Sequence, residues 1–388
     1  MPHFDYVYHG AAAANCVALG AVAPGNPAPN LQGLAGTAGA ALPALGGLPG
    51  AGFGGIAGVA GRVPYTWPAI TAATLIIGLY PPGAHPAYEA NWRIANLRMA
   101  AYTAPGGRLR RTPLLGNLET SERRYLSYFM GMNLSTYCAL VSGFTFPMHF
   151  ARFNALNGGV GVSHTQNGAF AAANLPDIAL INPGNGTCQS WEAKGRVGAA
   201  AVGGFAAGGV AAVLAGAINQ ARKVNSLLVA GALVAPNAWI ASVARLDPTT
   251  FWCLDLDDPP NRKRGADDMD ASASEPFYNE FYRPFVEMAS DSTTTVSFGG
   301  QDYVVADLPG TGVKVGLDQR IDRLYTRNPA KRPRTGGDSR TPADAVQAIE
   351  DYISAGYPQD AVNPDRYVSP EGIYVEAVES DITQPPPQ

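Results

Sequence analysis

Residues 175–196 read LPDIALINPGNGTCQSWEAKGR, and this stretch carries the clearest indication of fold and chemistry in the chain of 388 residues. An apolar run at 178–181 precedes a segment rich in Asn, Pro and Gly at 182–186, and a second run follows at 187–191. Residues of these types favour tight turns, and two short runs on either side of a turn are typical of a β-hairpin. The sequence therefore predicts two antiparallel strands joined by a short loop.

The predicted hairpin gathers charged side chains at one end. Side chains alternate between the two faces of a strand, so Glu192 and Lys194 share one face while Ala193 points away. Asp177 begins the first strand, and the turn brings it back toward the end of the second. Mg²⁺ prefers oxygen ligands and commonly binds one or two carboxylates together with waters and substrate phosphates. Two carboxylates and one ammonium at the end of a sheet therefore indicate metal-assisted chemistry on a phosphodiester.

The motif itself is Pro176-Asp177, fourteen further residues, and then Glu192-Ala193-Lys194. It resembles the PD-(D/E)XK nuclease superfamily, which has the restriction-endonuclease-like fold. The resemblance implies that Asp177 and Glu192 are ligands of Mg²⁺ or Mn²⁺, with the carbonyl of Ala193 as a third ligand. It also implies that Lys194 is the catalytic lysine, which positions or activates the attacking water.

The motif is short, and a surface hairpin that carries a solvated Glu192–Lys194 pair is the alternative interpretation. Two details favour the nuclease. The chain has five lysines, so that Glu-x-Lys occurs only once. That single occurrence falls on the predicted hairpin, and a proline directly precedes Asp177.

The resemblance covers residues 118–255, and for them it implies an α/β core of the order αβββαβ, a mixed sheet flanked by helices. Helical spacing of apolar residues and alternating patterns supply matching elements. The predicted elements are a helix at 120–141, a strand at 146–153, the hairpin, a helix at 209–228 and a strand at 238–246.

The segments outside this core are predicted to be extensions. Residues 1–117 form an Ala/Gly/Pro-rich and partly irregular N-terminal extension, with an apolar run at 63–83 that packs on the core. Residues 256–330 form a peripheral α/β extension, and residues 331–388 form a linker, a helix and a tail. Further predicted elements are helices at 89–99, 277–288 and 343–355, a hairpin at 293–307 and a strand at 313–317.

Two more residues are candidates for the site by resemblance. The first helix of this superfamily often contributes an acidic residue, which Glu122 matches as an additional metal ligand. A carboxylate that stabilises the start of a helix is the alternative reading of Glu122. The helix after the lysine strand often carries a Gln or Lys near the scissile phosphate, which makes Gln220 an auxiliary catalytic candidate; a plain surface residue is the alternative.

Basic side chains provide candidate contacts to the phosphate backbone. Arg108, Arg110 and Arg111 form a cluster, and Lys223 lies three residues after Gln220 and so on the same helical face. A solvated turn is the alternative interpretation of the arginine cluster. The formal net charge of −4 is unlike that of a basic nucleic-acid coat protein, and it is compatible with an enzyme that has a local basic groove.

Composition also indicates a compartment. The four cysteines are widely spaced without a Cys-x-x-Cys pair, which predicts free thiols in a reducing environment and argues against a zinc site. No secretory signal pattern opens the sequence, and no apolar run has the length and bulk of a transmembrane segment. We therefore expect a cytoplasmic protein.

The resemblance implies a Mg²⁺-dependent nuclease, and we expect DNA rather than RNA as its substrate and endonuclease rather than exonuclease activity. Many enzymes of the resembled fold cut two strands as dimers, so the resemblance is compatible with a homodimer. The competing hypothesis is a non-catalytic assembly protein of the capsid-like kind. The small-residue N-terminal arm, the acidic net charge and the many Pro/Gly loops suit that second function.

Overall fold

The computed structural model describes a large part of the chain at the level of individual residues. The residues described are 2–8, 59–81, 83–141, 145–155, 163–166, 174–182, 187–197, 213, 217, 220–221, 223–229, 232–234, 238–246, 253–257, 275–290, 292, 294–326, 342–354 and 363–377. They form a mixed α/β fold with several sheets, so the predicted α/β class is confirmed.

The largest sheet has seven strands in the order β2-β1-β12-β11-β8-β7-β5. The two hairpin strands β7 and β8 are antiparallel, β8 is parallel to its other neighbour β11, and β11 is antiparallel to β12. The bounds are β1 His3–Tyr8, β2 Val59–Pro64, β5 Met148–His149, β7 Ile178–Asn182, β8 Thr187–Val197, β11 Ala238–Leu246 and β12 Cys253–Asp257. The predicted hairpin and the predicted strand at 238–246 are confirmed.

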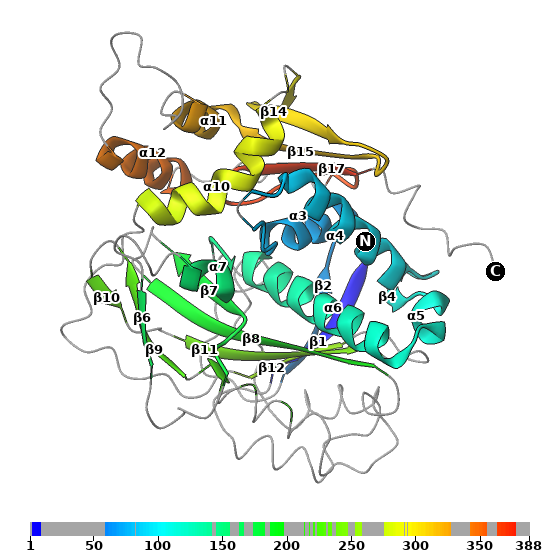
Figure 1. Ribbon diagram of the computed structural model, residues 1–388. Helices are drawn as coiled ribbons and strands as arrows, with labels where there is room; N and C mark the ends of the chain where they lie inside the picture. The colour runs from blue at the N-terminus through cyan, green and yellow to red at the C-terminus, as the bar shows by residue number, and fades with distance from the viewer. Residues whose placement is uncertain are drawn as a thin grey trace.

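Helix α6, Thr120–Val141, lies across β8 and β11 and has the predicted bounds (Figure 1). Two glycines allow the close approach of helix and strand. A Cβ added to Gly195 would lie 1.7 Å from the carbonyl oxygen of Ser127, and one added to Gly131 would lie 2.7 Å from the carbonyl of Lys194. The helix backbone therefore rests directly on the strand that carries Glu192 and Lys194.

Helix α3, Trp67–Ile76, is buried along its whole length between α6 and the C-terminal sheet. The side chain of Thr66 caps its first turn, and Pro68 occupies an early position where its missing N–H is not needed. Helix α4, Pro86–Ala100, follows and contacts both α3 and α6. The prediction that residues 63–83 pack on the core is confirmed for the segment 65–77, and the helix predicted at 89–99 is confirmed.

A second sheet of five strands, in the order β13-β14-β15-β17-β16, lies beyond α3 (Figure 1). Gly299 and Gly300 both have positive φ and close the predicted β13–β14 hairpin with a two-residue turn. The bounds are β13 Thr295–Phe298, β14 Gln301–Leu308, β15 Val313–Asp318, β16 Arg366–Val368, β17 Ile373–Ala377, and, for the helices, α10 Glu275–Ala289, α11 Gln319–Thr326 and α12 Pro342–Ser354. The helices predicted at 277–288 and 343–355 are confirmed.

Small elements complete the described fold. A three-stranded sheet has the order β10-β9-β6, and a two-stranded sheet joins β3 and β4. Their bounds and those of two short helices are β3 Ala101–Thr103, β4 Leu109–Arg111, β6 Ser163–Gln166, β9 Val224–Val229, β10 Ala232–Val234, α5 Pro113–Asn117 and α7 Phe150–Ala155.

Two predicted elements are wrong in part. In the strand predicted at 146–153, only Met148–His149 is a strand, because Phe150 and Phe153 lie three apart on a helical face and are both buried. In the helix predicted at 209–228, the described positions up to 221 are helical, and Val224–Val229 is strand β9. Pairing of β9 with β6 and β10 outweighs the weak helical preference of this segment.

The terminal extensions belong to the two main sheets rather than standing apart from them. Strand β1 pairs in parallel with β12 at the edge of the seven-stranded sheet, and β17 pairs with β15 in the second sheet. The predicted segments 1–117 and 331–388 therefore each contribute strands to sheets shared with neighbouring segments. Residues 9–58, which include most of the predicted irregular region, lie outside the described residues.

Helix length and the state of two cysteines complete the description of the fold. Within the described part of the chain, no helix combines the length and apolarity that crossing a bilayer requires. Cys138 and Cys188 are buried and form no disulfide, as predicted for them. The side chains of Cys16 and Cys253 lie outside the described residues.

Glu371 joins the second sheet to the core, and its titration predicts a pH-dependent stability. This fully buried side chain, in the turn before β17, accepts a hydrogen bond from Phe146 N at 2.7 Å; Tyr282 donates to its main-chain carbonyl, and Ser369 and Tyr352 also face it. Burial raises the pKa of Glu371 from 4.5 to about 7. Its stabilising contribution is therefore complete below about pH 4.5 and is lost as the pH rises through 7, about 3 kcal/mol in total.

Glu371→Gln tests this expectation, because glutamine keeps the acceptor for Phe146 N and cannot ionise. We expect the wild type to lose thermal stability relative to Glu371→Gln between pH 5 and pH 8, measured as melting temperatures across that range. Parallel pH profiles for the two proteins would contradict the assigned titration.

Candidate functional site

The hairpin brings the predicted carboxylates together. Strands β7 and β8 pair Ile178 with Trp191, so continuing the ladder by one position places Asp177 opposite Glu192. Directly opposed side chains on antiparallel strands have Cβ atoms about 5 Å apart. Lys194 lies two residues further along β8 on the same face as Glu192.

Asp177 is held on four sides. Tyr128 of α6 donates to Oδ1 at 2.9 Å, and the amide of Ala193 donates to Oδ2 at 3.0 Å. Its own amide donates to the carbonyl of Trp191 at 3.1 Å, and its carbonyl accepts from Phe150 N at 2.7 Å. The carboxylate is therefore oriented by α6 and β8, while β8 and α7 hold the main chain of Asp177. A carboxylate oriented in this way is suited to holding a ligand.

Glu192 is the most deeply buried member of the group, with 1% of its surface exposed. Lys194 Nζ pairs with its Oε1, whereas its Oε2 is buried and accepts no hydrogen bond from the residues that the structure describes. When Glu192 is protonated, its carboxyl group can donate to Asp177. Burial raises the pKa of Glu192, and the facing Asp177 carboxylate raises it further, against the opposing effect of Lys194. A buried, unpaired carboxylate oxygen beside a second carboxylate is costly unless something positively charged compensates it.

The main chain of Ala193 offers a further ligand. The N–H and C=O groups of a strand residue point to the same side, and the Ala193 amide points to Asp177. Its carbonyl therefore faces the same end of β7. Two carboxylates and one carbonyl are the oxygen donors that Mg²⁺ or Mn²⁺ prefers, and the unpartnered Oε2 of Glu192 fits such an ion.

No cluster of three His, Cys, Asp or Glu side chains suited to a metal occurs among the described residues, so an ion here would complete its shell with the carbonyl and with water. The chain matches no known protein-family model, no curated protein and no solved structure.

The two auxiliary candidates differ in position. The carboxylate of Glu122 accepts a hydrogen bond from Glu119 N at 3.1 Å and so caps its own helix, about 9 Å along the axis from Tyr128. The structure thus gives Glu122 the alternative, helix-start role. Gln220 precedes Ala221, whose carbonyl accepts from Ser190 at 3.0 Å. Ser190 shares a face with Glu192, about 7 Å away along β8, so the turn with Gln220 lies over this face.

The basic candidates occupy two other places. Arg108 precedes β4, and Arg110 and Arg111 lie within that strand, which is drawn near α5 and the start of α6 (Figure 1). All three are half-buried and have partners within the protein. Lys223 follows the turn of Gln220, to whose carbonyl its amide donates at 3.1 Å. Lys223 is thus the basic candidate closest along the chain to the turn that lies over the Glu192 face.

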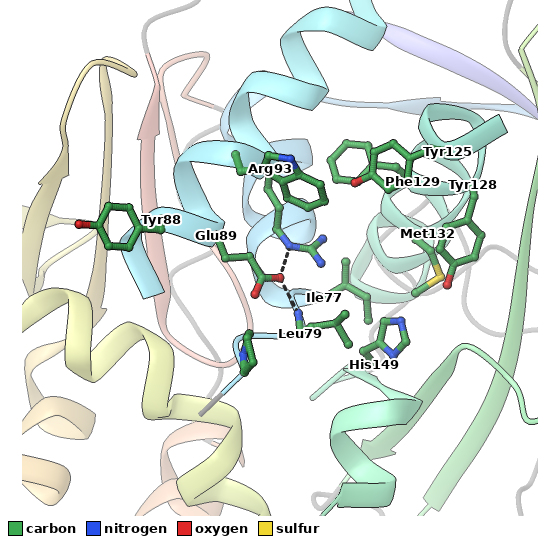
Figure 2. Close-up of a pocket in the computed structure, with 12 residues that line it drawn as sticks. Ile77, Leu79, Tyr88, Glu89, Arg93, Tyr125, Tyr128, Phe129, Met132 and His149 are labelled. Atoms are coloured by element: carbon green, nitrogen blue, oxygen red, sulfur yellow. Dashed lines mark hydrogen bonds and ion pairs between the residues drawn. The ribbon is translucent and has the colours of Figure 1, made fainter. Parts of the chain in front are cut away.

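A pocket that the sequence did not reveal adjoins Asp177. It has a volume of about 520 Å³ and lies between α4, α6 and the residues that follow α3 (Figure 2). Aromatic side chains dominate its lining: Tyr88, Trp92, Tyr125, Tyr128 and Phe129. Tyr125 and Phe129 have the helical spacing of a core face, but Tyr125 is half-exposed, and its ring is tilted against Trp92 with ring centres 5.6 Å apart.

Three polar side chains line the same pocket. Glu89 accepts hydrogen bonds from Arg93 Nε and from Leu79 N, each at 2.7 Å, and thereby positions the guanidinium (Figure 2). His149 accepts from Ala151 N through Nδ1, and burial together with nearby Arg93 lowers its pKa to about 4. The neutral ring therefore carries its proton on Nε2 as a donor. His149 thus adds a polar edge to a mainly aromatic lining.

Proposed function

We propose that the protein is a divalent-metal-dependent nuclease whose site consists of Asp177, Glu192, the Ala193 carbonyl and Lys194. The observation that carries the proposal is the buried Glu192 carboxylate, which faces Asp177 and has one oxygen that accepts no hydrogen bond within the described part of the chain. A solvated surface pair, the alternative from sequence, does not leave a carboxylate 1% exposed. Natural proteins retain such destabilising arrangements mainly at functional sites.

Each residue of the proposed site has its own role. Mg²⁺ or Mn²⁺, when bound, supplies charge stabilisation and a more acidic water. Asp177 and Glu192 hold the ion, and Tyr128 and the Ala193 amide keep Asp177 in the binding orientation. Lys194 is 29% exposed in its side chain, which leaves its ammonium able to turn from Glu192 toward a phosphate oxygen or an attacking water.

The arrangement of the large sheet supports a restriction-endonuclease-like core. Along the chain, α6, β5, β7, β8, the helical residues up to 221 and then β11 follow the αβββαβ order implied by the resemblance. The parallel pairing of β8 with β11 requires a crossover between them, and the helical residues lie in that connection. Helix α7 and the strands β6, β9 and β10 are insertions relative to this order.

Cleavage assays test the proposal. Wild-type protein is incubated with supercoiled plasmid, linear duplex, single-stranded DNA and RNA, each with Mg²⁺, Mn²⁺ or EDTA. We expect cleavage of nucleic acid, DNA above RNA, that requires the metal and is lost in Asp177→Ala. Asp307→Ala, which removes an exposed carboxylate on β14 of the second sheet, is the matched control and keeps full activity.

The same samples discriminate the assembly hypothesis. If the nucleic acid stays intact under every condition and sedimentation detects large ordered particles, the nuclease hypothesis is wrong and the assembly hypothesis is favoured. Cleavage that persists in EDTA or in Asp177→Ala would equally remove the proposed site.

A further inference from the structure

We propose that the aromatic pocket between α4 and α6 binds an unpaired nucleobase of the substrate beside the phosphate that is cleaved at Asp177 and Glu192. The inference rests on the proposed nuclease function and narrows the substrate class to single-stranded or locally unpaired nucleic acid.

The aromatic side chains of the pocket are unusually open to solvent. Tyr88 is 77% exposed and Trp92 48% exposed, and Tyr125 and Tyr128 are exposed to a smaller extent. These four residues account for most of the large exposed apolar side chains of the described structure, and an exposed patch of this kind marks a binding surface. Nucleobases stack on aromatic faces irrespective of sequence, which makes such rings the usual platform for single strands.

Arg93 and His149 supply polar donors that can bind the edge of a nucleobase. The guanidinium of Arg93 lies 6.0 Å from the ring centre of Trp92, and together with His149 it is turned toward the space between α4 and α6 (Figure 2). Arg93 and the Nε2 proton of His149 are hydrogen-bond donors for the carbonyl oxygens of a base. Arg93 already donates to Glu89 through Nε and to the carbonyl of Thr74 through Nη1. A purely apolar occupant, such as an acyl chain or the apolar face of a helix, would offer no acceptor to its remaining N–H groups or to Nε2 of His149, at a cost in free energy.

The pocket is joined to Asp177 through two of its lining residues. Tyr128 lines the pocket with its ring and donates its hydroxyl to Asp177 at 2.9 Å. His149 lines the pocket and pairs with Ile178, the residue after Asp177. A single-stranded nucleic acid whose phosphate lies at Asp177 can therefore place the adjoining base in the pocket while it stays in contact with the protein surface. The volume of about 520 Å³ lies within the range of small-molecule sites and accommodates a base.

A base within a duplex cannot use this pocket, because neighbouring bases cover both of its faces and its partner covers its edge. It must first be unpaired and extruded, which costs a few kcal/mol and is least costly in single strands. The pocket therefore selects substrates that already contain unpaired nucleotides.

Binding in EDTA tests the inference without cleavage. Fluorescence anisotropy is measured with a labelled oligothymidylate of about 15 nucleotides and with a duplex of the same length. We expect the wild type to prefer the single strand and Trp92→Leu to bind it about tenfold or more weakly. Trp92→Tyr, which restores a stacking ring, is expected to recover most of the affinity. Leu114→Ala, on α5 and 40% exposed outside the pocket, is the control and binds as the wild type does.

Outcomes for the pocket and for the nuclease are separable. The pocket assignment would be overturned if Trp92→Leu binds the single strand as tightly as the wild type does, or if Trp92→Tyr binds it no more tightly than Trp92→Leu. It would also be overturned if the wild type prefers the duplex or binds neither oligonucleotide. If binding depends on Trp92 but no metal-dependent cleavage is detected, the base-binding pocket is supported and the nuclease function is rejected. If the protein cleaves duplex DNA and its binding does not depend on Trp92, the base-binding pocket is rejected and the nuclease function is supported.

Discussion

Lys194→Ala is expected to reduce the rate of metal-dependent cleavage by about 10²–10⁴-fold, the range found when a positioned proton-transfer or charge-stabilising group is removed. The lysine lies next to both carboxylates and pairs with Glu192. Removal of its positive charge also removes a repulsion toward a divalent cation. Mg²⁺ should therefore bind the variant at least as tightly as it binds the wild type, which titration calorimetry measures.

This split between activity and binding distinguishes a catalytic from a structural role. Lys314→Ala is the matched control, because Lys314 also pairs with a glutamate, Glu376, across neighbouring strands of the second sheet. It should retain wild-type cleavage. If Lys194→Ala cleaves at the wild-type rate, the lysine has no part in the chemistry; if the variant also loses Mg²⁺ binding, its role is to support the site.

Glu192→Gln is expected to abolish cleavage and, at pH 8 without metal, to stabilise the protein by about 1–3 kcal/mol. The substitution removes a buried charge that faces Asp177, and the new amide can donate to that carboxylate. Mg²⁺ should stabilise the wild type, by about 2.7 kcal/mol at a concentration one hundred times Kd, and should leave the variant unchanged. Melting temperatures with and without Mg²⁺ measure both effects.

Glu376→Gln provides the opposite case. Burial acts to raise the pKa of Glu376, but hydrogen bonds from Lys314 and Tyr374 and the nearby charges lower it. The glutamine variant should therefore gain no stability and should leave the response to Mg²⁺ intact. If Glu192→Gln melts at a lower temperature than the wild type in EDTA, the Glu192 carboxylate stabilises the metal-free fold. That result would contradict our claim that this carboxylate lowers the stability of the metal-free protein.

Local patterns explain why much of the fold was predictable. The turn residues between β7 and β8 and the helical spacing in α6 are properties of contiguous sequence, and both elements appear with the expected bounds. The hairpin at Gly299 and Gly300 follows from the same kind of signal, because both positions need positive φ. These elements bring Asp177 and Glu192 together without reference to the remaining chain.

Non-local pairing explains what the sequence did not reveal. Nothing in the sequence of β1 indicates that it pairs with β12, some 250 residues later, or that β17 pairs with β15. Likewise, Tyr125 and Phe129 have the spacing of a core face, and only the placement of α4 opposite α6 leaves Tyr125 beside a pocket. The burial of Glu192 depends on the same tertiary contacts, so its unpaired oxygen is visible only in the structure.

The Mg²⁺ dependence of cleavage by the wild type and by Glu192→Gln tests the central claim most directly. A labelled single-stranded oligonucleotide is cut under single-turnover conditions while Mg²⁺ is titrated. We predict a wild-type rate that rises from zero in EDTA and saturates with Mg²⁺, and no detectable cleavage by Glu192→Gln at any concentration. Equal rates in EDTA and in Mg²⁺, or equal rates for the two proteins, would contradict a metal-dependent site at Asp177 and Glu192.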